Sequence, residues 1–96
     1  MAAYFIIDIE VHDPEGIKDY QKQVPETLRT HGGRYLVRGG AYETLEGEWP
    51  ASRIVVLEFP DARSAKAWYH SDAYQKILPI RLRCSSAKFF TLVDGL

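Results

Sequence analysis

The chain has very little cysteine and no excess of charge of either sign. Cys84 is the single cysteine among 96 residues, so an internal disulfide is impossible and a disulfide-stapled secreted scaffold is excluded. Twelve Lys and Arg residues stand against 13 Asp and Glu residues, which gives a formal net charge of −1. This balance lacks the basic excess that binding to a nucleic-acid backbone or an anionic membrane needs. We therefore expect neither nucleic acid nor membrane as a partner.

Long apolar runs and cofactor motifs are also missing. The N-terminus has no basic stretch, and the apolar run that follows it is interrupted by Asp8. This predicts neither a signal peptide nor a membrane span, and a cytoplasmic location follows as an expectation. His12, His31 and His70 are far apart, without metal-ligand spacing, and no nucleotide-binding loop occurs. We expect no metal, no haem and no other cofactor.

What is present is the composition of an ordinary globular protein. Hydrophobic residues make up 46% and charged residues 26% of the chain, which excludes a disordered tail or a fibrous repeat. The length fits one domain, spanning residues 1–96, with a single core and no linker.

Hydrophobic periodicity divides this domain into alternating strands and helices. Asp61 and Ser71 are predicted N-caps of helical segments. Pro25 predicts a kink or break near Gln23, since proline lacks the N–H that continues a helix. The pattern predicts strands at residues 4–11, 34–42, 53–59 and 88–93, a bulge at 39–40, a hairpin at 46–50, and helices at 13–33 and 60–84.

This order is that of the α+β ferredoxin-like βαββαβ fold, a four-stranded antiparallel sheet with helices on one face. The opposite face is then left with large apolar side chains, more than a monomer usually exposes. The same surface of a second copy would cover it, so the sequence predicts a homodimer. The alternation places six residues on this open face: Ile6, Leu36, Ile54, Val56, Phe90 and Leu92.

Several short stretches resemble a bacterial family known only as domain of unknown function 1330 (DUF1330), in the dimeric α+β barrel superfamily. They are residues 31–40 (HGGRYLVRGG), 46–49 (EGEW), 56–60 (VLEFP), 65–71 (AKAWYHS), 74–75 (YQ) and 93–95 (VDG), together with Tyr20 and Arg81. The resemblance implies a barrel built from two subunits, with a pocket between each sheet and its helices. It implies no reaction, because the superfamily includes cofactor-free monooxygenases, muconolactone isomerase-like enzymes, haem-dependent enzymes and proteins that only bind ligands.

The first candidate site lies in residues 31–40. His31, near a helix end, is a candidate general acid or base, because its ordinary pKa is near neutral pH. Arg34 and Arg38 are predicted on one strand face, where they are candidates to bind a carboxylate or enolate. The alternative is purely structural: the glycines form a cap and a bulge, and the arginines pair with acids such as Glu58 on the same face.

The second candidate site lies in the helical segment after residue 60. Trp68 is predicted in the core, whereas Tyr69 and Tyr74 carry hydroxyl groups that need partners and are candidates to contact a ligand. Arg81 either interacts with the helix end or binds an anionic ligand. Trp49, in the polar hairpin, is predicted to pack on a partner subunit.

Three functions are compatible with these residues. The first is a cofactor-independent enzyme that performs proton transfer or oxygenation on a small organic acid or aromatic compound, with His31 as acid or base. The second is a non-catalytic module that binds or senses a small molecule in the same pocket. The third is a structural protein whose interior has no cavity.

Overall fold

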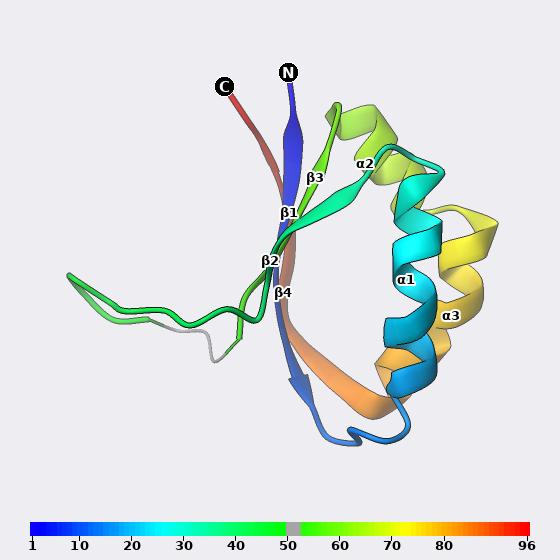
Figure 1. Ribbon diagram of the computed structural model, residues 1–96, viewed down its shortest axis with the longest axis horizontal. Coiled ribbons are helices and arrows are strands. Elements are labelled where there is room, and N and C mark those ends of the chain that lie inside the picture. Colours follow the sequence, from blue (N-terminus) through cyan, green and yellow to red (C-terminus); the bar gives the residue numbers. More distant parts are fainter. Residues whose placement is uncertain (50–52) are drawn as a thin grey trace.

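Four strands form one antiparallel sheet, in the order β2-β3-β1-β4. The computed structural model describes residues 1–49 and 53–96. The elements are β1 (Ala3–Val11), α1 (Lys18–Arg29), β2 (Arg34–Arg38), β3 (Val55–Phe59), α2 (Ala62–Tyr69), α3 (Asp72–Cys84) and β4 (Ser85–Asp94) (Figure 1). The predicted ferredoxin-like α+β class is confirmed, with the last helical region divided into α2 and α3.

All three helices cover the same face of the sheet, and Figure 1 shows the sheet edge-on with the helices to its right. The side chains between these layers form one apolar core. Burial of these large side chains is the main driving force for the fold. The core includes Phe5, Ile7, Leu57 and Phe59 from the sheet and Val24, Leu28, Trp68, Tyr74 and Ile77 from the helices.

The two predicted N-caps are confirmed. The side chain of Asp61 accepts a hydrogen bond from the Ser64 N–H at 2.7 Å, and Ser71 Oγ accepts one from the Tyr74 N–H at 3.2 Å. Each satisfies a backbone donor that the first helical turn leaves free. The Ser71 cap separates α3 from α2, so the sequence signal and the helix boundary agree.

The prolines do not divide the helices. α1 continues through Pro25 and α3 through Pro79, so of the kink or break predicted near Gln23 the break does not occur. Each proline removes a single helix hydrogen bond, whereas both helices are held by a buried stripe against the core. α1 begins later than predicted, at Lys18. It is followed by Gly32 with a φ of 73°, a conformation that favours glycine.

The second and third strands are shorter than predicted. β2 ends at Arg38, and Gly39 turns the chain away with a φ of 67°, its N–H donating to the Ile54 carbonyl at 2.8 Å. Residues 39–49, here called the arm, contain no strand. The predicted hairpin at 46–50 is partly outside the described residues.

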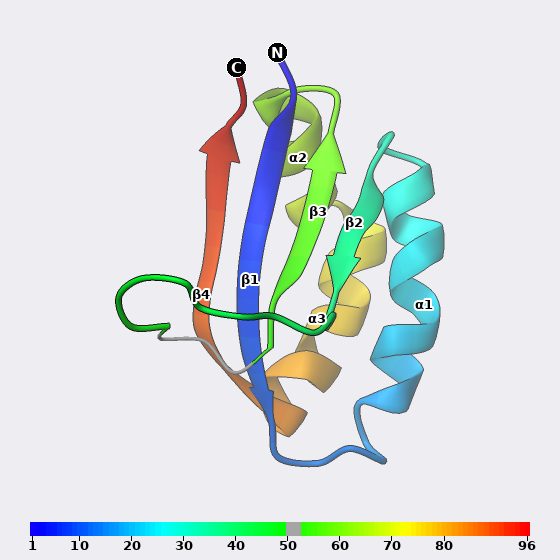
Figure 2. The same cartoon turned by 60° about the vertical axis from the view of Figure 1, so that its left-hand side comes forward.

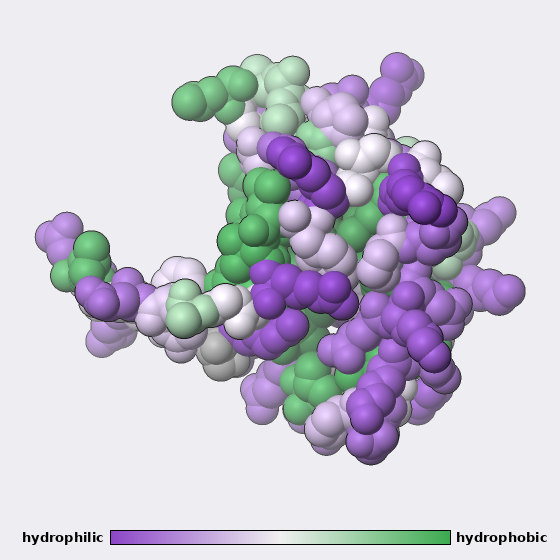
Figure 3. Space-filling view, in the orientation of Figure 1, coloured by the Kyte–Doolittle hydropathy of each residue, from purple (hydrophilic) through white to green (hydrophobic). Residues whose placement is uncertain are grey.

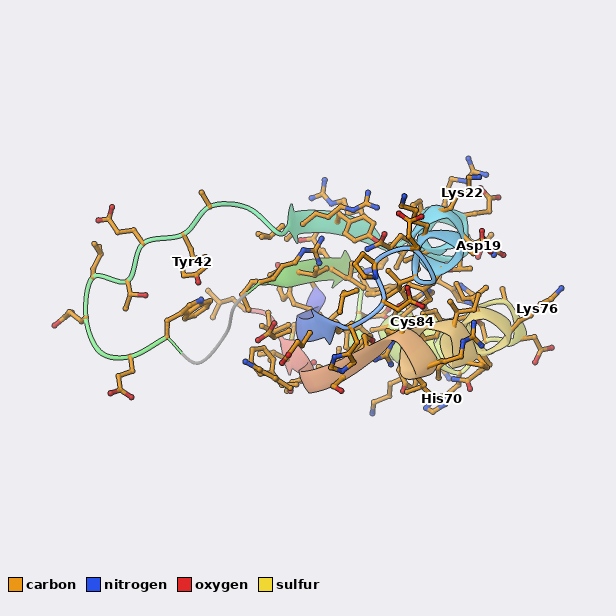
Figure 4. All side chains as sticks on the ribbon, turned by 90° about the horizontal axis from the view of Figure 1, so that it is seen from below. Asp19, Lys22, Tyr42, His70, Lys76 and Cys84 are labelled. Carbon is orange, nitrogen blue, oxygen red and sulfur yellow. The ribbon has the colours of Figure 1, made fainter. Side chains whose placement is uncertain are left out.

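The arm and the open face of the sheet lie on the side opposite the helices. Figure 2 views the sheet from this open side, with the helices behind it and the arm crossing in front. The view from below shows the arm, marked by Tyr42, extending away from the sheet (Figure 4). Tyr42, Leu45 and Trp49 of the arm are exposed.

Phe90 and Leu92 are not on the open face, which corrects the prediction. In the β1–β4 ladder Ile7 is opposite Phe90 and Phe5 is opposite Leu92, and opposite residues share a face. Both therefore pack on the core. The alternation of an isolated strand leaves its two faces equivalent, so only the pairing with β1 decides which side is buried.

The open face is nevertheless apolar over much of its area. Ile6 and Val56 are opposite each other, and Val37 is opposite Val56. Val37 and Val93 are each more than a third exposed. Apolar side chains gather above the arm, on the open side of the sheet (Figure 3).

Among the described helices, none is long and apolar enough to cross a membrane.

Candidate functional site

A cavity of about 70 Å³ lies between α1 and the helix-covered face of the sheet. Three of its walls come from β1, from α1 and from β2 with β3, and its remaining surface comes from Trp68 and Phe90. A volume of this size holds several water molecules or a small organic group. The lining residues are Ile7, Ile9, Val11, Ile17, Tyr20, Gln21, Val24, Tyr35, Arg38, Arg53, Val55, Leu57, Trp68 and Phe90.

Arg38 and Arg53 are the two charged residues of this lining. Both are exposed, whereas the other lining side chains are buried or half-buried. The Arg38 guanidinium lies 4.5 Å from the centre of the Tyr35 ring. No carboxylate lines the cavity in the described part of the chain, so the site is apolar inside and positively charged at its exposed border.

An irregularity in β2 brings Arg38 to the cavity. Tyr35 is opposite Leu57, but the register then shifts, so that Val37 is opposite Val56 and Arg38 is opposite Val55. The extra residue, Leu36, reverses the alternation beyond it. Arg38 therefore shares the helix-covered face with Tyr35, and its prediction on one face with Arg34 is wrong.

Arg34 lies on the open face of the sheet. It forms an ion pair of 2.8 Å with Glu58, its partner across the β2–β3 ladder. This hydrogen bond lowers the pKa of Glu58, while the Glu58 carboxylate raises the pKa of the neighbouring Tyr4. The geometry matches the structural alternative for Arg34 and places it away from the cavity.

Tyr74 and Arg81 lie directly behind the cavity, in a buried polar network with Tyr20. The Tyr20 and Tyr74 hydroxyl oxygens are 2.7 Å apart, and Arg81 Nε donates to the Tyr74 hydroxyl at 3.3 Å. Arg81 is only 3% exposed. Tyr20 lines the cavity itself, so the network connects a buried cation to the cavity wall.

Burial controls the ionisation of these phenols. It raises the pKa of Tyr20 far above its ordinary value, and the Tyr74 hydroxyl adds to this effect. Burial also raises the pKa of Tyr74, although the neighbouring Arg81 opposes the increase. Both hydroxyls are therefore protonated at neutral pH and act as hydrogen-bond donors rather than as bases.

Tyr69 lies in a second, shallower hollow of about 250 Å³ at the β4 edge of the sheet, where α2 covers it. His70 and Lys66 lie in the same hollow, and Phe90 separates it from the α1 cavity by lining both. The structure thus places Tyr69 in a different hollow from Arg38, although the centre of its ring lies 5.5 Å from that of Tyr74.

His31 follows the end of α1 and lines neither hollow. Its Nδ1 is 3.2 Å from the Thr27 carbonyl and 3.2 Å from Thr30 Oγ1, so this nitrogen donates or accepts according to the tautomer of the ring. Val24 is the last residue of α1 in the cavity wall, two helical turns before His31. The catalytic role of His31 stays a prediction.

Sequence reasoning missed four lining residues that carry polar groups: Tyr20, Gln21, Tyr35 and Arg53. Tyr20 had a signal, because a tyrosine within a buried helical stripe needs a partner for its hydroxyl. Arg53 and Gln21 had none. The described residues contain no group of three His, Cys, Asp or Glu side chains placed to hold a metal ion.

Comparison with known proteins identifies a family and a fold. The family model described as "Domain of unknown function (DUF1330)" matches residues 2–96. No curated protein sequence matches the chain.

Three solved structures share the fold at low sequence identity. RPA0582 of Rhodopseudomonas palustris, a protein of unknown function, is 12% identical with a TM-score of 0.75, over 99% of this chain and 82% of its own. SnoaB of Streptomyces nogalater, a cofactor-independent oxygenase, is 12% identical with a TM-score of 0.66, over 99% and 93%. A conserved protein of Methanosarcina mazei Go1 is 20% identical with a TM-score of 0.54, over 97% and 90%.

Proposed function

The chain belongs to the DUF1330 family, and we propose that it is a homodimer that binds a small organic acid with an apolar body in the α1 cavity. One observation carries the proposal: the cavity combines apolar walls with two arginines at its border and no carboxylate among the described lining residues. Apolar pockets with a few placed polar groups are typical of small-molecule sites. Without a carboxylate in the lining, the positive charge of these arginines favours an anionic ligand.

The size of the cavity restricts the ligand. About 70 Å³ is less than half of the roughly 150 Å³ in which an engineered apolar cavity holds benzene. A short acid of about four carbons is therefore the first class to test, and a larger aromatic acid requires Arg38 or Arg53 to move outward. Both side chains are exposed.

The test is a comparison of an acid with its neutral amide. Crotonate and crotonamide have nearly the same shape and differ in charge, so isothermal titration with both separates charge recognition from apolar burial. We expect saturable binding of crotonate that is at least about tenfold tighter than binding of crotonamide, because a charged hydrogen bond contributes more than a neutral one. Equal affinities, or no binding by a series of short acids, would contradict the proposal.

Arg38→Gln is the matched variant, with Arg63→Gln as control. Arg63 is an exposed residue of α2 that lines neither hollow. We expect Arg38→Gln to weaken crotonate binding several-fold and Arg63→Gln to leave it unchanged.

A second candidate function is cofactor-independent catalysis by proton transfer or oxygenation. The phenol hydroxyls beside an apolar cavity favour it, as does the fold shared with SnoaB, a cofactor-independent oxygenase. Any acid that binds should be incubated with the protein in air, with oxygen uptake and product mass as readouts. Product formation that is lost in His31→Ala and retained in His12→Ala supports the predicted role of His31. If the ligand binds and no product forms, the protein is a non-catalytic binding module.

The homodimer proposal depends on the open face and on the arm. Apolar side chains remain on that face, and the arm extends from the same side with Tyr42, Leu45 and Trp49 exposed. Covering both with a second copy would bury this surface. A native mass spectrum at twice 11.0 kDa is the expected result, and a persistent monomer at high concentration would contradict it.

A further inference from the structure

Arg81 is a buried cation whose position is set by aromatic neighbours. It lies two turns after Tyr74 on the same side of α3, and its guanidinium is 4.9 Å from the centre of the Phe90 ring. Its one side-chain hydrogen bond in the described structure is that from Nε to Tyr74. A guanidinium has five N–H donors, so most of its capacity is unused by the protein.

No carboxylate of the described residues lies within ion-pair distance of Arg81. The ion pairs of the described residues involve Lys18, Arg29 and Arg34 as the cations, and residues 50–52 are Pro, Ala and Ser. A buried charge without a counter-charge is strongly unfavourable. The Phe90 ring and the carboxyl end of α3 offset only part of this, so an anion would complete the site.

The hydrogen bonds of the network can run in two directions. Arg81 only donates, so the Tyr74 oxygen accepts from it. Between Tyr20 and Tyr74 either hydroxyl can be the donor. When Tyr74 donates, the Tyr20 proton has no acceptor among the described residues. Since Tyr20 lines the cavity, a ligand oxygen there can accept this proton and so favour that direction.

We infer that the Tyr20–Tyr74–Arg81 network is the anion-recognition subsite of the cavity. The Tyr20 hydroxyl donates a hydrogen bond to a negatively charged oxygen of the ligand, and the buried Arg81 charge stabilises that oxygen through Tyr74. The ligand class is a short, planar carboxylate or its enolate, with its carbon chain against the rings of Trp68 and Phe90. This inference rests on the proposed function, because it requires an acid in the cavity.

The test measures crotonate affinity by isothermal titration in the unmodified chain and in three variants. Arg81→Met keeps the volume of the side chain and removes its charge, Tyr20→Phe removes the terminal donor, and Arg83→Met is the control on an exposed arginine of the same helix. We expect a loss of about tenfold or more for Arg81→Met and several-fold for Tyr20→Phe. Arg83→Met should bind as the natural protein does, and crotonamide affinity should change little in any variant.

A second measurement does not depend on the ligand. If Arg81 is held in place for an absent anion, Arg81→Met removes an unbalanced charge, so its Tm without ligand should equal or exceed that of the natural protein. A clearly lower Tm indicates a structural cation and would overturn the inference. If Arg81→Met does not fold, the crotonate affinity of Tyr20→Phe tests the inference instead, and an unchanged affinity would overturn it.

The outcomes separate the two proposals. If the natural protein binds crotonate and only Arg38→Gln weakens it, the subsite is wrong while the proposed function stands. If the natural protein binds no short acid, the proposed function fails, and the subsite with it.

Discussion

Arginine side chains have different partners on the two faces of the sheet. On the open face, the exposed Arg34 is paired with the half-buried Glu58 at 2.8 Å. On the helix-covered face, Arg38 lies over an aromatic ring, and Arg81 is buried against another ring with a phenol as its hydrogen-bond acceptor. Neither of these two arginines has an ion-pair partner in the described structure.

The difference fits the roles proposed above for the two faces. Exposed pairs such as Arg34–Glu58 add little stability, and they leave a face that a second copy can cover. A buried cation without a carboxylate beside it, such as Arg81, is unfavourable in the empty protein and favourable in one that holds an acid. The open face therefore suits association, and the covered face suits binding.

The largest expected effect is on the covered face, with Trp68→Ala. Trp68 is 1% exposed, donates to Thr27 Oγ1 at 3.0 Å and forms part of the cavity wall. Its loss should lower the free energy of unfolding by about 3–5 kcal/mol, measured by urea denaturation. Leu82→Ala, at a site 63% exposed on α3, is the control and should change stability by less than about 0.5 kcal/mol. Similar values for both variants would remove the contrast between core and surface.

The next effect concerns the open face. Val56→Glu places a charge between Ile6 and Val37, which disfavours burial against a second copy. We expect the mass measured by light scattering to fall from twice 11.0 kDa to 11.0 kDa with the circular dichroism spectrum unchanged. Lys76→Glu, exposed on the helix side, should remain a dimer. A Val56→Glu protein that also remains a dimer would show that the interface lies elsewhere.

A smaller effect is expected for the pH dependence of crotonate affinity, which tests the residues of the covered face. The pKa values of Tyr20 and Tyr74 are both raised, and arginine stays charged throughout the range. Crotonate affinity should therefore be constant from about pH 6 to pH 9 and should fall only where crotonate itself becomes protonated. A loss of affinity that centres between pH 6 and pH 8 would point instead to a titrating histidine such as His31.

The smallest effect is expected from the ion pair of the open face. Because the pKa of Glu58 is lowered in the folded protein, the pair stabilises the fold above the ordinary carboxyl pKa of about 4.5. That contribution is lost as the pH falls through the lowered value. Glu58→Gln should lower the Tm at pH 7 by at most a few degrees and should change it less at pH 3. A larger loss would mean that the pair is less exposed to solvent than it is in the single subunit.

Much of the fold could be predicted because its signals are local. The caps at Asp61 and Ser71 depend on side chains that bond to their own helix, and the end of α1 at Gly32 depends on the φ that glycine allows. Pro25 misled the prediction, since its local cost is smaller than the packing of the whole buried stripe.

The candidate site could be predicted only in part. Arg38, Tyr74 and Arg81 were singled out by residue type and by family resemblance, and they do lie at or behind one cavity. Arg34 and Arg38 were assigned to one face because strict alternation was assumed, whereas the irregularity at Leu36 separates them. Nothing local marks that position.

The sequence by itself determined the order of the elements, their caps and the family, because these depend on neighbouring residues and on recurring motifs. Only the tertiary structure decided which face Phe90 and Arg38 occupy, and that Tyr20 meets Tyr74 across 54 positions of the chain. Strand register and helix packing are set by contacts between distant segments, so one slipped residue changes the face of every side chain beyond it.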